Sequence, residues 1–231
     1  MNKLIVVSGG TRGIGKAIIE KFAKEGFDIA TCSRNANELE ALKLAIESEF
    51  STQKVHIFQA DLSDKVQTKA FAIFVLELEQ NIEVLVNNTG VFIPSSLLSE
   101  DDGTLEQQIN TNLYSAYYLS KALLPNMIER KNGYLVNICS VASIEPHLAS
   151  GSYTVSKFAM LGLSKALRQE LKPHHIKVTA VLPGAVLTSA WDGLSVDTTQ
   201  FITPADIAAL LWTCHQLSPA AVVEEILMRP M

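Results

Sequence analysis

Near its amino end the chain reads Leu4-Ile5-Val6-Val7-Ser8-Gly9-Gly10-Thr11-Arg12-Gly13-Ile14-Gly15. Apolar residues that favour β-structure run directly into a glycine-rich turn, and an amphipathic helical pattern follows. Glycines in such a turn let the chain reverse tightly, bring backbone N–H groups close to a pyrophosphate and seat the helix against the strand. Glycine-rich turns also occur for purely structural reasons, but strand, turn and helix in this order favour a dinucleotide-binding site.

The same alternation of short apolar strands and longer amphipathic helices continues along the chain. Several strands are apolar throughout, as expected where helices cover both faces of a parallel sheet. The pattern predicts an α/β fold: a doubly wound Rossmann fold with a seven-stranded, mostly parallel sheet flanked by helices on both faces. The predicted strands are Leu4–Ser8, Asp28–Ser33, Val55–Ala60, Val84–Asn87, Gly133–Ser140, Lys177–Leu182 and Val223–Arg229, and the predicted helices span 14–25, 35–50, 64–80, 104–130, 152–172 and 204–217.

No repeat, low-complexity segment or linker interrupts this pattern, so residues 1–231 are predicted to form one domain that both binds the dinucleotide and carries the chemistry. The least regular stretch is 183–203, which is too long and too polar for a tight connection. Ligands of doubly wound sheets bind beyond the carboxyl ends of the strands. Because residues 183–203 follow such an end, they are a candidate substrate lid.

Composition narrows the classes of function. Hydrophobic residues make up 48% and charged residues 19% of the 231, which is typical of a folded globular protein. The net charge is −5 without a basic run, so nucleic acid is not an expected partner. Three unpatterned cysteines suit a reducing compartment better than disulfides or a metal site. No signal segment precedes the first strand and no apolar run approaches the roughly 18–20 residues of a bilayer span, so we expect a cytoplasmic protein with no membrane partner.

The end of the second predicted strand indicates which dinucleotide would bind. A ribose 2′-hydroxyl is commonly held by an acidic residue about 20 residues beyond the glycines, whereas a 2′-phosphate calls for arginine. The strand ends Thr31-Cys32-Ser33-Arg34, with no carboxylate. Arg12 offers a second cation to the same region, and an arginine fork matches a phosphate. NADP(H) is therefore favoured over NAD(H); the alternative is that both arginines are solvated surface residues.

Two further strand ends carry polar residues where a nucleotide would pass. Asp61 closes the third strand beside Leu62, and its carboxylate could accept from an adenine amine. It could equally be the N-cap of the following helix, a common place for Asp. Asn87-Asn88-Thr89-Gly90 closes the fourth strand, although asparagine and glycine also make ordinary turns.

The stretch Gly151-Ser152-Tyr153-Thr154-Val155-Ser156-Lys157 holds the candidate chemistry. On a helix, Tyr153 and Lys157 stand at i and i+4, which places a phenol and an ammonium on one face about a turn apart. A fixed cation stabilises the phenolate form, so such a tyrosine could act as a general acid near neutrality. Taken alone the pair is more often a surface contact, and its weight depends on the other motifs.

The motifs occur together in one order: Ser8-Gly9-x-x-x-Gly13-x-Gly15, Asn87-Asn88-Thr89-Gly90, Ser140 thirteen residues before Tyr153, Tyr153-x-x-x-Lys157, and Pro183-Gly184-x-Val186-x-Thr188. Over essentially the whole chain this set resembles the short-chain dehydrogenase/reductase family. The resemblance implies a single Rossmann-type domain that transfers a hydride. The candidate cofactor contacts are Ser8, Gly9, Thr11, Arg12, Gly13, Ile14, Gly15, Ser33, Arg34, Asp61, Leu62, Asn88, Thr89, Gly90, Tyr153, Lys157, Pro183, Gly184, Val186 and Thr188.

The resemblance also implies a role for each member of the catalytic centre. Tyr153 would donate its proton to a carbonyl oxygen during reduction and accept it during oxidation. Lys157 would stabilise the tyrosinate and hold the nicotinamide ribose, and Ser140 would hydrogen-bond the substrate oxygen. Asn112 matches the position where the family holds a water that links the lysine to solvent. A carbonyl that accepts hydride develops negative charge on oxygen, which preplaced donors stabilise.

The chain departs from the family pattern at three places. Ser8 stands where threonine is more usual, Thr89 replaces the alanine of the Asn-Asn-Ala-Gly motif, and Cys139 precedes Ser140 where serine is frequent. The bulk and hydroxyl of Thr89 are expected to alter packing near the adenosine, and Cys139 is expected to be a small buried residue. The chain is also shorter after Thr188 than in many relatives, so we expect a reduced lid and a more open pocket.

Substrate and assembly are less well indicated. Phe92, His147 and Trp191 are candidate substrate contacts, although His147 could be an exposed loop residue without a role and Trp191 could simply anchor its loop. In the helix after Tyr153, a stripe of small residues at spacings of 3 and 4 (Ala159, Gly162, Ala166) permits close approach of another helix. The alternative is packing on the chain's own sheet. Because family members pair this helix across a two-fold axis, we predict a homodimer or homotetramer.

Two other classes of function compete with an oxidoreductase acting on a carbonyl/alcohol pair. One is a catalytically silent NADP(H)-binding regulatory protein, since fold alone does not determine function. The presence of all four candidate catalytic residues argues against it. The other is an epimerase or dehydratase of the extended branch, which would carry a C-terminal substrate domain. About 43 residues follow Thr188, too few for a further domain.

Overall fold

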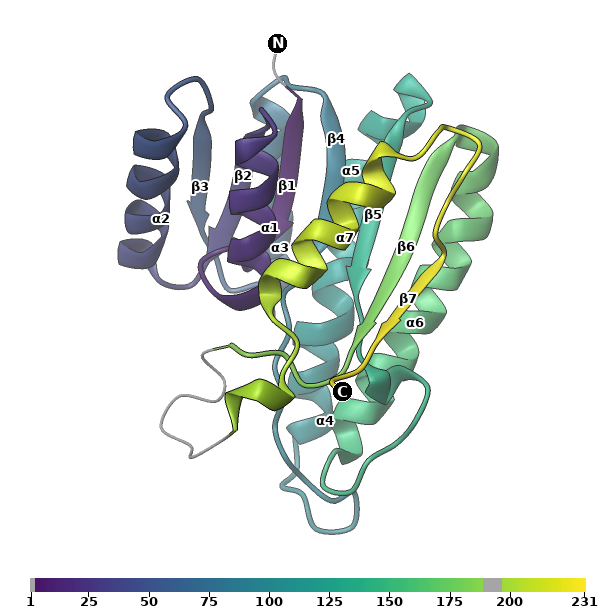
Figure 1. Ribbon diagram of the computed structural model, residues 1–231. Coiled ribbons are helices and arrows are strands. Elements are labelled where there is room, and N and C mark those ends of the chain that lie inside the picture. The colour runs from purple at the N-terminus through teal and green to yellow at the C-terminus, as the bar shows by residue number, and fades with distance from the viewer. Residues whose placement is uncertain (1–2, 189–196) are drawn as a thin grey trace.

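The computed structural model describes residues 3–188 and 197–231 (Figure 1). The strands are β1 (Leu4–Ser8), β2 (Asp28–Ser33), β3 (Val55–Gln59), β4 (Ile82–Asn87), β5 (Gly133–Ile138), β6 (Ile176–Pro183) and β7 (Glu225–Met228). The helices are α1 (Gly13–Lys24), α2 (Ala36–Glu49), α3 (Lys65–Glu77), α4 (Thr104–Ile109), α5 (Ser115–Arg130), α6 (Gly151–Leu171) and α7 (Pro204–Gln216). Single turns of 3₁₀-helix lie at Val141–Ser143, Lys172–His174 and Thr198–Gln200.

The seven strands form one sheet in the order β3-β2-β1-β4-β5-β6-β7, and every neighbouring pair is parallel. The predicted doubly wound α/β fold is therefore confirmed. The chain moves outward from β1 to β3 and then returns to the other side of β1 with β4. The order reverses between β1 and β4, so their carboxyl ends, Ser8 and Asn87, flank the point where such folds bind ligands.

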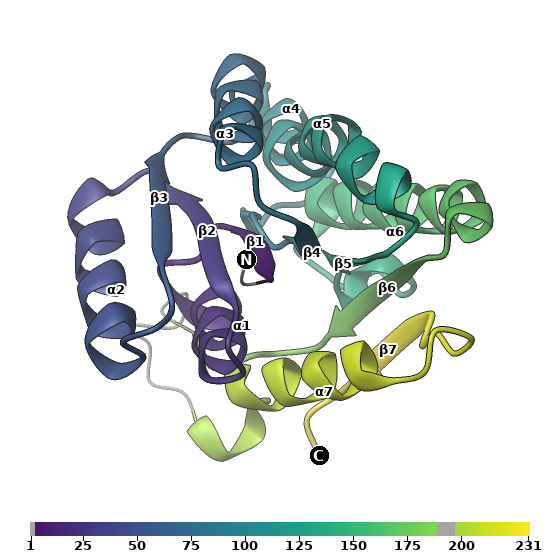
Figure 2. The ribbon, with the colours of Figure 1, turned by 90° about the horizontal axis from the view of Figure 1, so that it is seen from above.

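Helices cover both faces of the sheet, with α1, α2 and α7 on one side and α3, α4, α5 and α6 on the other (Figure 2). Strand β1 explains the apolar run in the sequence, because all five of its residues are buried. Ile5 and Val7 belong to the cluster that includes Phe22 of α1, and Leu4 and Val6 belong to the cluster that includes Phe71 of α3. Each such side chain removed from water contributes roughly 1.5–3 kcal/mol.

Strand ends differ from the predicted ones where pairing decides them. β4 begins at Ile82, two residues before the predicted Val84, because Ile82 pairs with Leu4 of β1. β7 is limited to Glu225–Met228, since it pairs only with the last four residues of β6. β5 ends at Ile138, so Cys139 and Ser140 have left the strand.

The predicted helix over 104–130 is not uniform. It consists of α4, a π-helical turn at Asn110–Tyr114, and α5. The extra residue in the π turn comes where Asn112 directs its side chain to another segment. In the part of the chain that the structure describes, no helix is long and apolar enough to cross a membrane.

Candidate active site

The glycine turn between β1 and α1 has the geometry that the sequence predicts for close approach of a ligand. Gly9 and Gly13 have φ values of +67° and +50°, in the left-handed region that glycine adopts without strain. A Cβ atom built on Gly15 would lie 2.5 Å from the Gly9 carbonyl oxygen, so only glycine lets the helix start against the turn. Arg12, the residue before α1, makes no side-chain hydrogen bond to the first N–H groups of the helix. Backbone N–H groups at the start of a helix point outward along its axis and attract an anion.

The ends of β1 and β4 are tied to each other. Ser8 Oγ accepts hydrogen bonds from the N–H groups of Asn88 (2.9 Å) and Thr89 (3.0 Å). Asn88 Nδ2 donates to the carbonyl oxygens of Ser8 (3.0 Å) and Gly9 (2.9 Å). Serine thus performs the tie expected of the usual threonine, and the polar atoms of this strand end fix the glycine turn. Thr89 Oγ1 lies 3.1 Å from a Cβ built on Gly9, and it is buried without a hydrogen-bond partner.

The carboxylate of Glu38, in the first turn of α2, lies beside the glycine turn, although the end of β2 itself contains no carboxylate. Arg12 Nε donates to Glu38 Oε2 (2.9 Å) and Arg12 Nη2 to Glu38 Oε1. Asn35, the N-cap of α2, donates from Nδ2 to Glu38 Oε1 (2.8 Å). Hydrogen bonding from Arg12, foremost, lowers the pKa of Glu38. The spacing Asn35-x-x-Glu38 at a helix start is a capping-box pattern that could have identified this residue.

The other candidate cofactor contacts in the glycine turn and at the end of β2 have different surroundings. Thr11 Oγ1 donates to Ser33 Oγ (3.3 Å), which joins the glycine turn to the strand end. Arg34 is exposed and forms no ion pair with any residue that the structure describes. Ile14 is partly buried and packs against the core.

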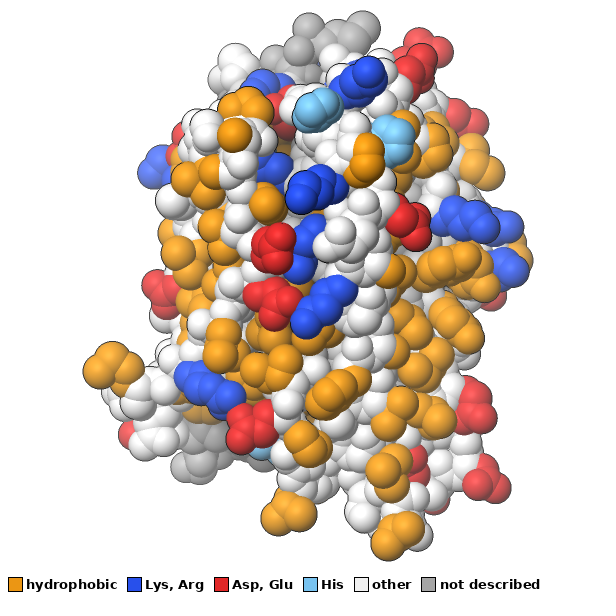
Figure 3. Space-filling view, turned by 90° about the vertical axis from the view of Figure 1, so that its right-hand side faces the viewer, with side chains coloured by type: hydrophobic (Ala, Val, Ile, Leu, Met, Phe, Trp, Pro, Cys, Tyr) orange, Lys and Arg blue, Asp and Glu red, His pale blue; other side chains and the backbone are white. Residues whose placement is uncertain are grey.

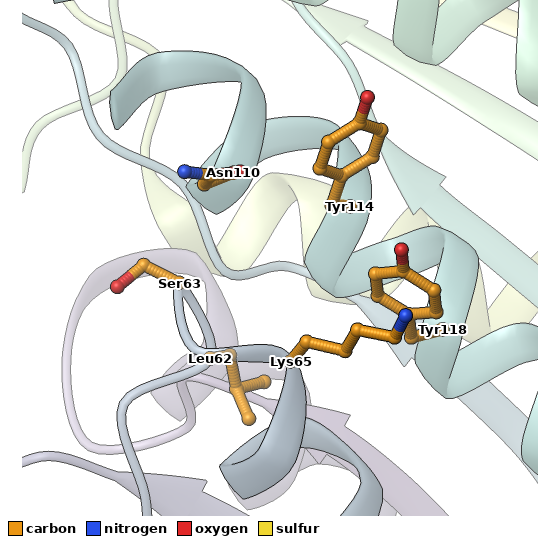
Figure 4. Close-up of a pocket in the computed structure, with 6 residues that line it drawn as sticks. All are labelled: Leu62, Ser63, Lys65, Asn110, Tyr114 and Tyr118. Atoms are coloured by element: carbon orange, nitrogen blue, oxygen red, sulfur yellow. The ribbon is translucent and has the colours of Figure 1, made fainter. Parts of the chain in front are cut away.

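Asp61 is not the N-cap of α3. Its Oδ1 accepts from the N–H and hydroxyl of Ser63 (2.9 and 2.8 Å), whereas the cap is Asp64. The helix begins three residues later than an Asp61 cap would require, because a turn at Leu62–Ser63 intervenes. This turn borders a surface pocket of about 200 Å³ that lies between the start of α3 and the π turn with the beginning of α5 (Figure 4). The pocket is lined by Leu62, Ser63, Lys65, Asn110, Tyr114 and Tyr118.

Tyr153 and Lys157 lie on one face of α6, as the spacing predicts. The Lys157 ammonium is 5.7 Å from the centre of the Tyr153 ring. Lys157 is only 5% exposed, and its Nζ donates to the Ile138 carbonyl oxygen at the end of β5 (3.0 Å). Helix α6 and the carboxyl end of the sheet therefore hold the pair together.

Asn112 connects the π turn to the same place. Its Oδ1 accepts from Val91 N–H (2.7 Å), and its Nδ2 donates to the Val91 carbonyl (2.9 Å) and to Ser156 Oγ (2.9 Å). A Cβ built on Gly90 would lie 3.3 Å from Asn112 Oδ1 and 3.6 Å from Lys157 Nζ. Gly90, Asn112 and Lys157 therefore converge, from segments far apart in the sequence.

Ser140 lies two residues beyond the carbonyl that Lys157 contacts. Its Oγ accepts from Ala142 N–H (3.1 Å) and its N–H donates to Ser143 Oγ (3.2 Å), a capping box on the short 3₁₀ turn. The Ser140 hydroxyl donates to no acceptor among the described residues, so its hydrogen can turn toward a ligand. Cys139 is 2% exposed, and burial raises the pKa of its thiol to about 11, which fits the expected inert role.

The candidate substrate contacts have different surroundings. Phe92 is 53% exposed and meets Tyr153 edge to face, with ring centres 4.9 Å apart. His147 is exposed on a loop where its backbone bonds Ser150. Trp191 lies outside the described residues. The segment that carries Phe92 is held to the start of α6 by Ser95 N–H to the Ala149 carbonyl (3.0 Å).

The chain after β6 returns to the glycine turn. Gly184 N–H donates to the Met228 carbonyl (2.8 Å), and Val186 forms a bridge with Ile202. The methyl group of Thr188 would lie 2.9 Å from a Cβ on Gly13. Pro183, Gly184, Val186 and Thr188 therefore follow one edge of the site, and the candidate lid begins beside the glycine turn.

Fold and site together define a doubly wound α/β protein with a glycine turn at its switch point and a Tyr-Lys pair on α6. The short chain dehydrogenase family matches residues 3–198. The chain belongs to this family of oxidoreductases.

Three known proteins illustrate the similarity. The sepiapterin reductase of Chlorobaculum tepidum is 32% identical over 100% of this chain and 97% of that protein. A metagenomic short-chain oxidoreductase solved in complex with NADP is 30% identical, with a TM-score of 0.85 over 99% of this chain and 97% of the other. An alcohol dehydrogenase from the archaeon Thermococcus sibiricus, complexed with 5-hydroxy-NADP, is 25% identical, with a TM-score of 0.92 over 99% and 97%.

Proposed function

We propose that this protein is an NADP(H)-dependent oxidoreductase that transfers a hydride between the cofactor and a carbonyl or secondary alcohol, with Tyr153 as general acid/base. The observation that carries the proposal is the phenol of Tyr153 beside the buried ammonium of Lys157, where Asn112 and Gly90 converge. A buried cation beside a tyrosine favours the charged form of the phenol during proton transfer.

The residues present fit a dinucleotide. The first N–H groups of α1 attract an anion, and Gly9 and Gly13 adopt the left-handed conformation with which the chain turns into that helix start. The NADP-type ligands in two similar solved structures support the choice of NADP(H), as does the exposed Arg34.

When bound, the nicotinamide supplies or takes the hydride. The chain's own residues would handle the proton and the developing charge. Tyr153 donates its phenolic proton to the carbonyl oxygen in the reductive direction, and the Ser140 hydroxyl donates to the same oxygen. Lys157 uses one N–H on the Ile138 carbonyl, which leaves two for the nicotinamide ribose and a water. Asn112 holds Val91 and Ser156 in place, and so fixes the strand exit beside Lys157.

Further proposals concern the whole chain. We propose that residues 1–231 act as one domain in the cytoplasm and that Phe92 contacts the substrate. We also propose that 183–203 are the substrate lid, of which 189–196 lie outside the described residues. Phe92 is supported by its contact with Tyr153. Release of a stable fragment by limited proteolysis would contradict the single domain. A Phe92→Ala variant with an unchanged KM for every substrate would contradict the contact between Phe92 and the substrate.

The decisive experiment replaces Tyr153 with phenylalanine and follows NADPH oxidation with a carbonyl panel that includes sepiapterin. Loss of the general acid should lower turnover at least about 10²-fold, while NADPH affinity changes little. Tyr117→Phe, the same change on the exposed side of α5, is the matched control. Full turnover by Tyr153→Phe would refute the mechanism. Tight NADPH binding without turnover on any carbonyl would favour the silent regulatory protein instead.

A further inference from the structure

The pair formed by Arg12 and Glu38 lies where the adenosine ribose of the proposed cofactor would end. Arg12, in the glycine turn, directs two nitrogens of its guanidinium to the two carboxylate oxygens of Glu38, in the first turn of α2. Asn35 adds a third hydrogen bond to the same carboxylate. The Glu38 side chain is 27% exposed and that of Arg12 is 61% exposed, so solvent and ligands can reach the pair.

Glu38 acts in opposite directions on the two dinucleotides. A ribose 2′-hydroxyl can donate a hydrogen bond to a carboxylate, as acidic residues at this end of the fold commonly accept it. A 2′-phosphate is repelled by the same carboxylate and needs the arginine fork, which is already bound. The phosphate must therefore compete with Glu38 for Arg12.

We propose that Glu38 is a specificity-determining residue that restrains the preference for NADPH over NADH by holding Arg12. The proposal rests on the proposed function, because it concerns the same cofactor site. Arg34 then provides the preference that remains, since this exposed guanidinium has no ion-pair partner among residues 3–188 and 197–231. The two arginines would differ in role, because Arg34 can bind the 2′-phosphate directly whereas Arg12 must first release Glu38.

A network of hydrogen bonds around Ser33 and Asn35 holds Glu38 in position. Ser33 Oγ accepts from Thr11 Oγ1 (3.3 Å) and from Asn35 N–H (3.2 Å), so the glycine turn, the end of β2 and the start of α2 are joined. The Asn35 side chain also accepts from the Asn37 and Glu38 N–H groups and fixes the first turn of α2. Glu38 is thus held both by the glycine turn and by the start of α2.

The competing explanation is an ordinary surface ion pair that holds α2 to the glycine turn. Such pairs stabilise a protein by only about 0–1 kcal/mol and do not distinguish one dinucleotide from the other. Affinities for NADPH and NADH separate the two explanations, because only the first predicts changes of opposite sign.

The experiment measures dissociation constants of NADPH and NADH by fluorescence titration for the parent, Glu38→Gln, Arg12→Gln and the double variant. Glutamine keeps the size of the side chain and removes its charge. Glu38→Gln should bind NADPH about tenfold more tightly and NADH more weakly, because one repulsive charge is lost beside the phosphate and one acceptor is lost beside the hydroxyl. In the Arg12→Gln background the gain in NADPH affinity should shrink to about twofold.

Glu40→Gln is the matched control, since Glu40 is exposed on the same helix and its loss changes net charge equally. It should leave both constants within about twofold of the parent. Equal changes for NADPH and NADH in Glu38→Gln, or no change, would overturn the role of Glu38 while leaving the proposed function intact. A parent that binds neither dinucleotide would overturn the proposed function itself.

Discussion

At the scale of single residues, Lys157 is the side chain whose position is hardest to explain by stability. Its ammonium lies where only 5% of the residue is exposed, and removing a charge from water is unfavourable. A carbonyl from β5 and the ring of Tyr153 compensate only in part. Buried charges of this kind are frequent at functional sites, which agrees with the role proposed for it.

Replacing Lys157 with methionine tests that role. We expect turnover to fall at least about 10²-fold and NADPH affinity to fall as well, because the same ammonium serves the phenol and the ribose. Tyr153→Phe should differ by losing turnover alone. Steady-state rates and NADPH titration of both variants check this, with Lys165→Met, which is exposed on the same helix, as the control. Normal NADPH affinity in Lys157→Met would argue against its contact with the ribose.

At the scale of elements, the glycine turn is a packing unit of β1, α1 and the end of β4. Asn88 donates to the Gly9 carbonyl, and a Cβ on Gly15 would lie 2.6 Å from that Asn88 amide nitrogen. The helix start, the turn and the neighbouring strand end are therefore in direct van der Waals contact at Gly15. The absence of a side chain at Gly15 is a requirement of the packing as well as of the ligand.

Gly15→Ala should lower the free energy of unfolding by about 1–3 kcal/mol, because a methyl group is forced against backbone and amide atoms. Glu20→Ala, at an exposed position of the same helix, is the matched control. A surface substitution of this kind should change stability by about 0.5 kcal/mol or less. Urea unfolding of the two variants measures both effects, and equal stabilities would contradict the packing argument.

At the scale of the whole molecule, Glu83 of β4 connects its strand to two parts of the chain that are distant in sequence, Lys3 and helix α7. Its Oε1 lies 3.0 Å from Lys3 Nζ, ahead of β1, and 3.6 Å from His215 Nε2 in α7. His215 in turn packs edge to face against Phe22 and Phe27. The contact with His215, then that with Lys3, lowers the pKa of Glu83 from 4.5 to about 2.

This pKa shift predicts an acid-sensitive contribution to stability. Because the carboxyl pKa is lower in the folded protein than in the unfolded one, the contribution is complete above about pH 4.5 and is lost as the pH falls toward 2. Glu83→Gln should therefore be less stable at pH 7, by on the order of 2 kcal/mol, with the difference shrinking toward pH 3. Urea unfolding at several pH values tests this, with the exposed Glu129→Gln as control. A difference that is independent of pH would refute it.

The outer face of α6 bears on assembly. Gly162 and Ala166 are exposed, as are Val155 (42%) and Phe158 (45%), whereas Ala159 is half-buried, so most of the small-residue stripe does not pack on the chain's own sheet. The side of the molecule seen in Figure 3 shows hydrophobic side chains interspersed with Lys, Arg, Asp and Glu side chains. This arrangement supports the proposed homodimer or homotetramer.

A charge on this face should break the assembly. We expect Phe158→Glu to be monomeric by light scattering at micromolar concentration, because an unpaired carboxylate would be buried at the contact. Val66→Glu, at an exposed position of α3, should keep the parent's mass. A parent that is monomeric, or a Phe158→Glu variant with the parent's mass, would contradict this location of the interface.

Prediction from the sequence succeeded where the signal is local. Each of the seven strands was expected within a few residues of its position, since apolar β-forming runs and glycine or asparagine at their ends are short-range features. The differences lie where partners decide, since β4 extends to Ile82 because β1 pairs with it. Of the two roles that Asp61 could take, the structure excludes the N-cap, which is Asp64. The π turn at Asn110–Tyr114 likewise follows from contacts of Asn112 with Val91 and Ser156.

The sequence by itself determined the doubly wound fold, the glycine turn and the Tyr153–Lys157 pair, because these depend on alternation within strands and on the i,i+4 geometry of one helix. Only the tertiary structure decided that Glu38 holds Arg12, that Asn112 bonds Ser156, and that Asn88 supports Gly9. These partners are 26, 44 and 79 residues apart. Contacts over such separations depend on how helices pack on the sheet, a property that local periodicity does not contain.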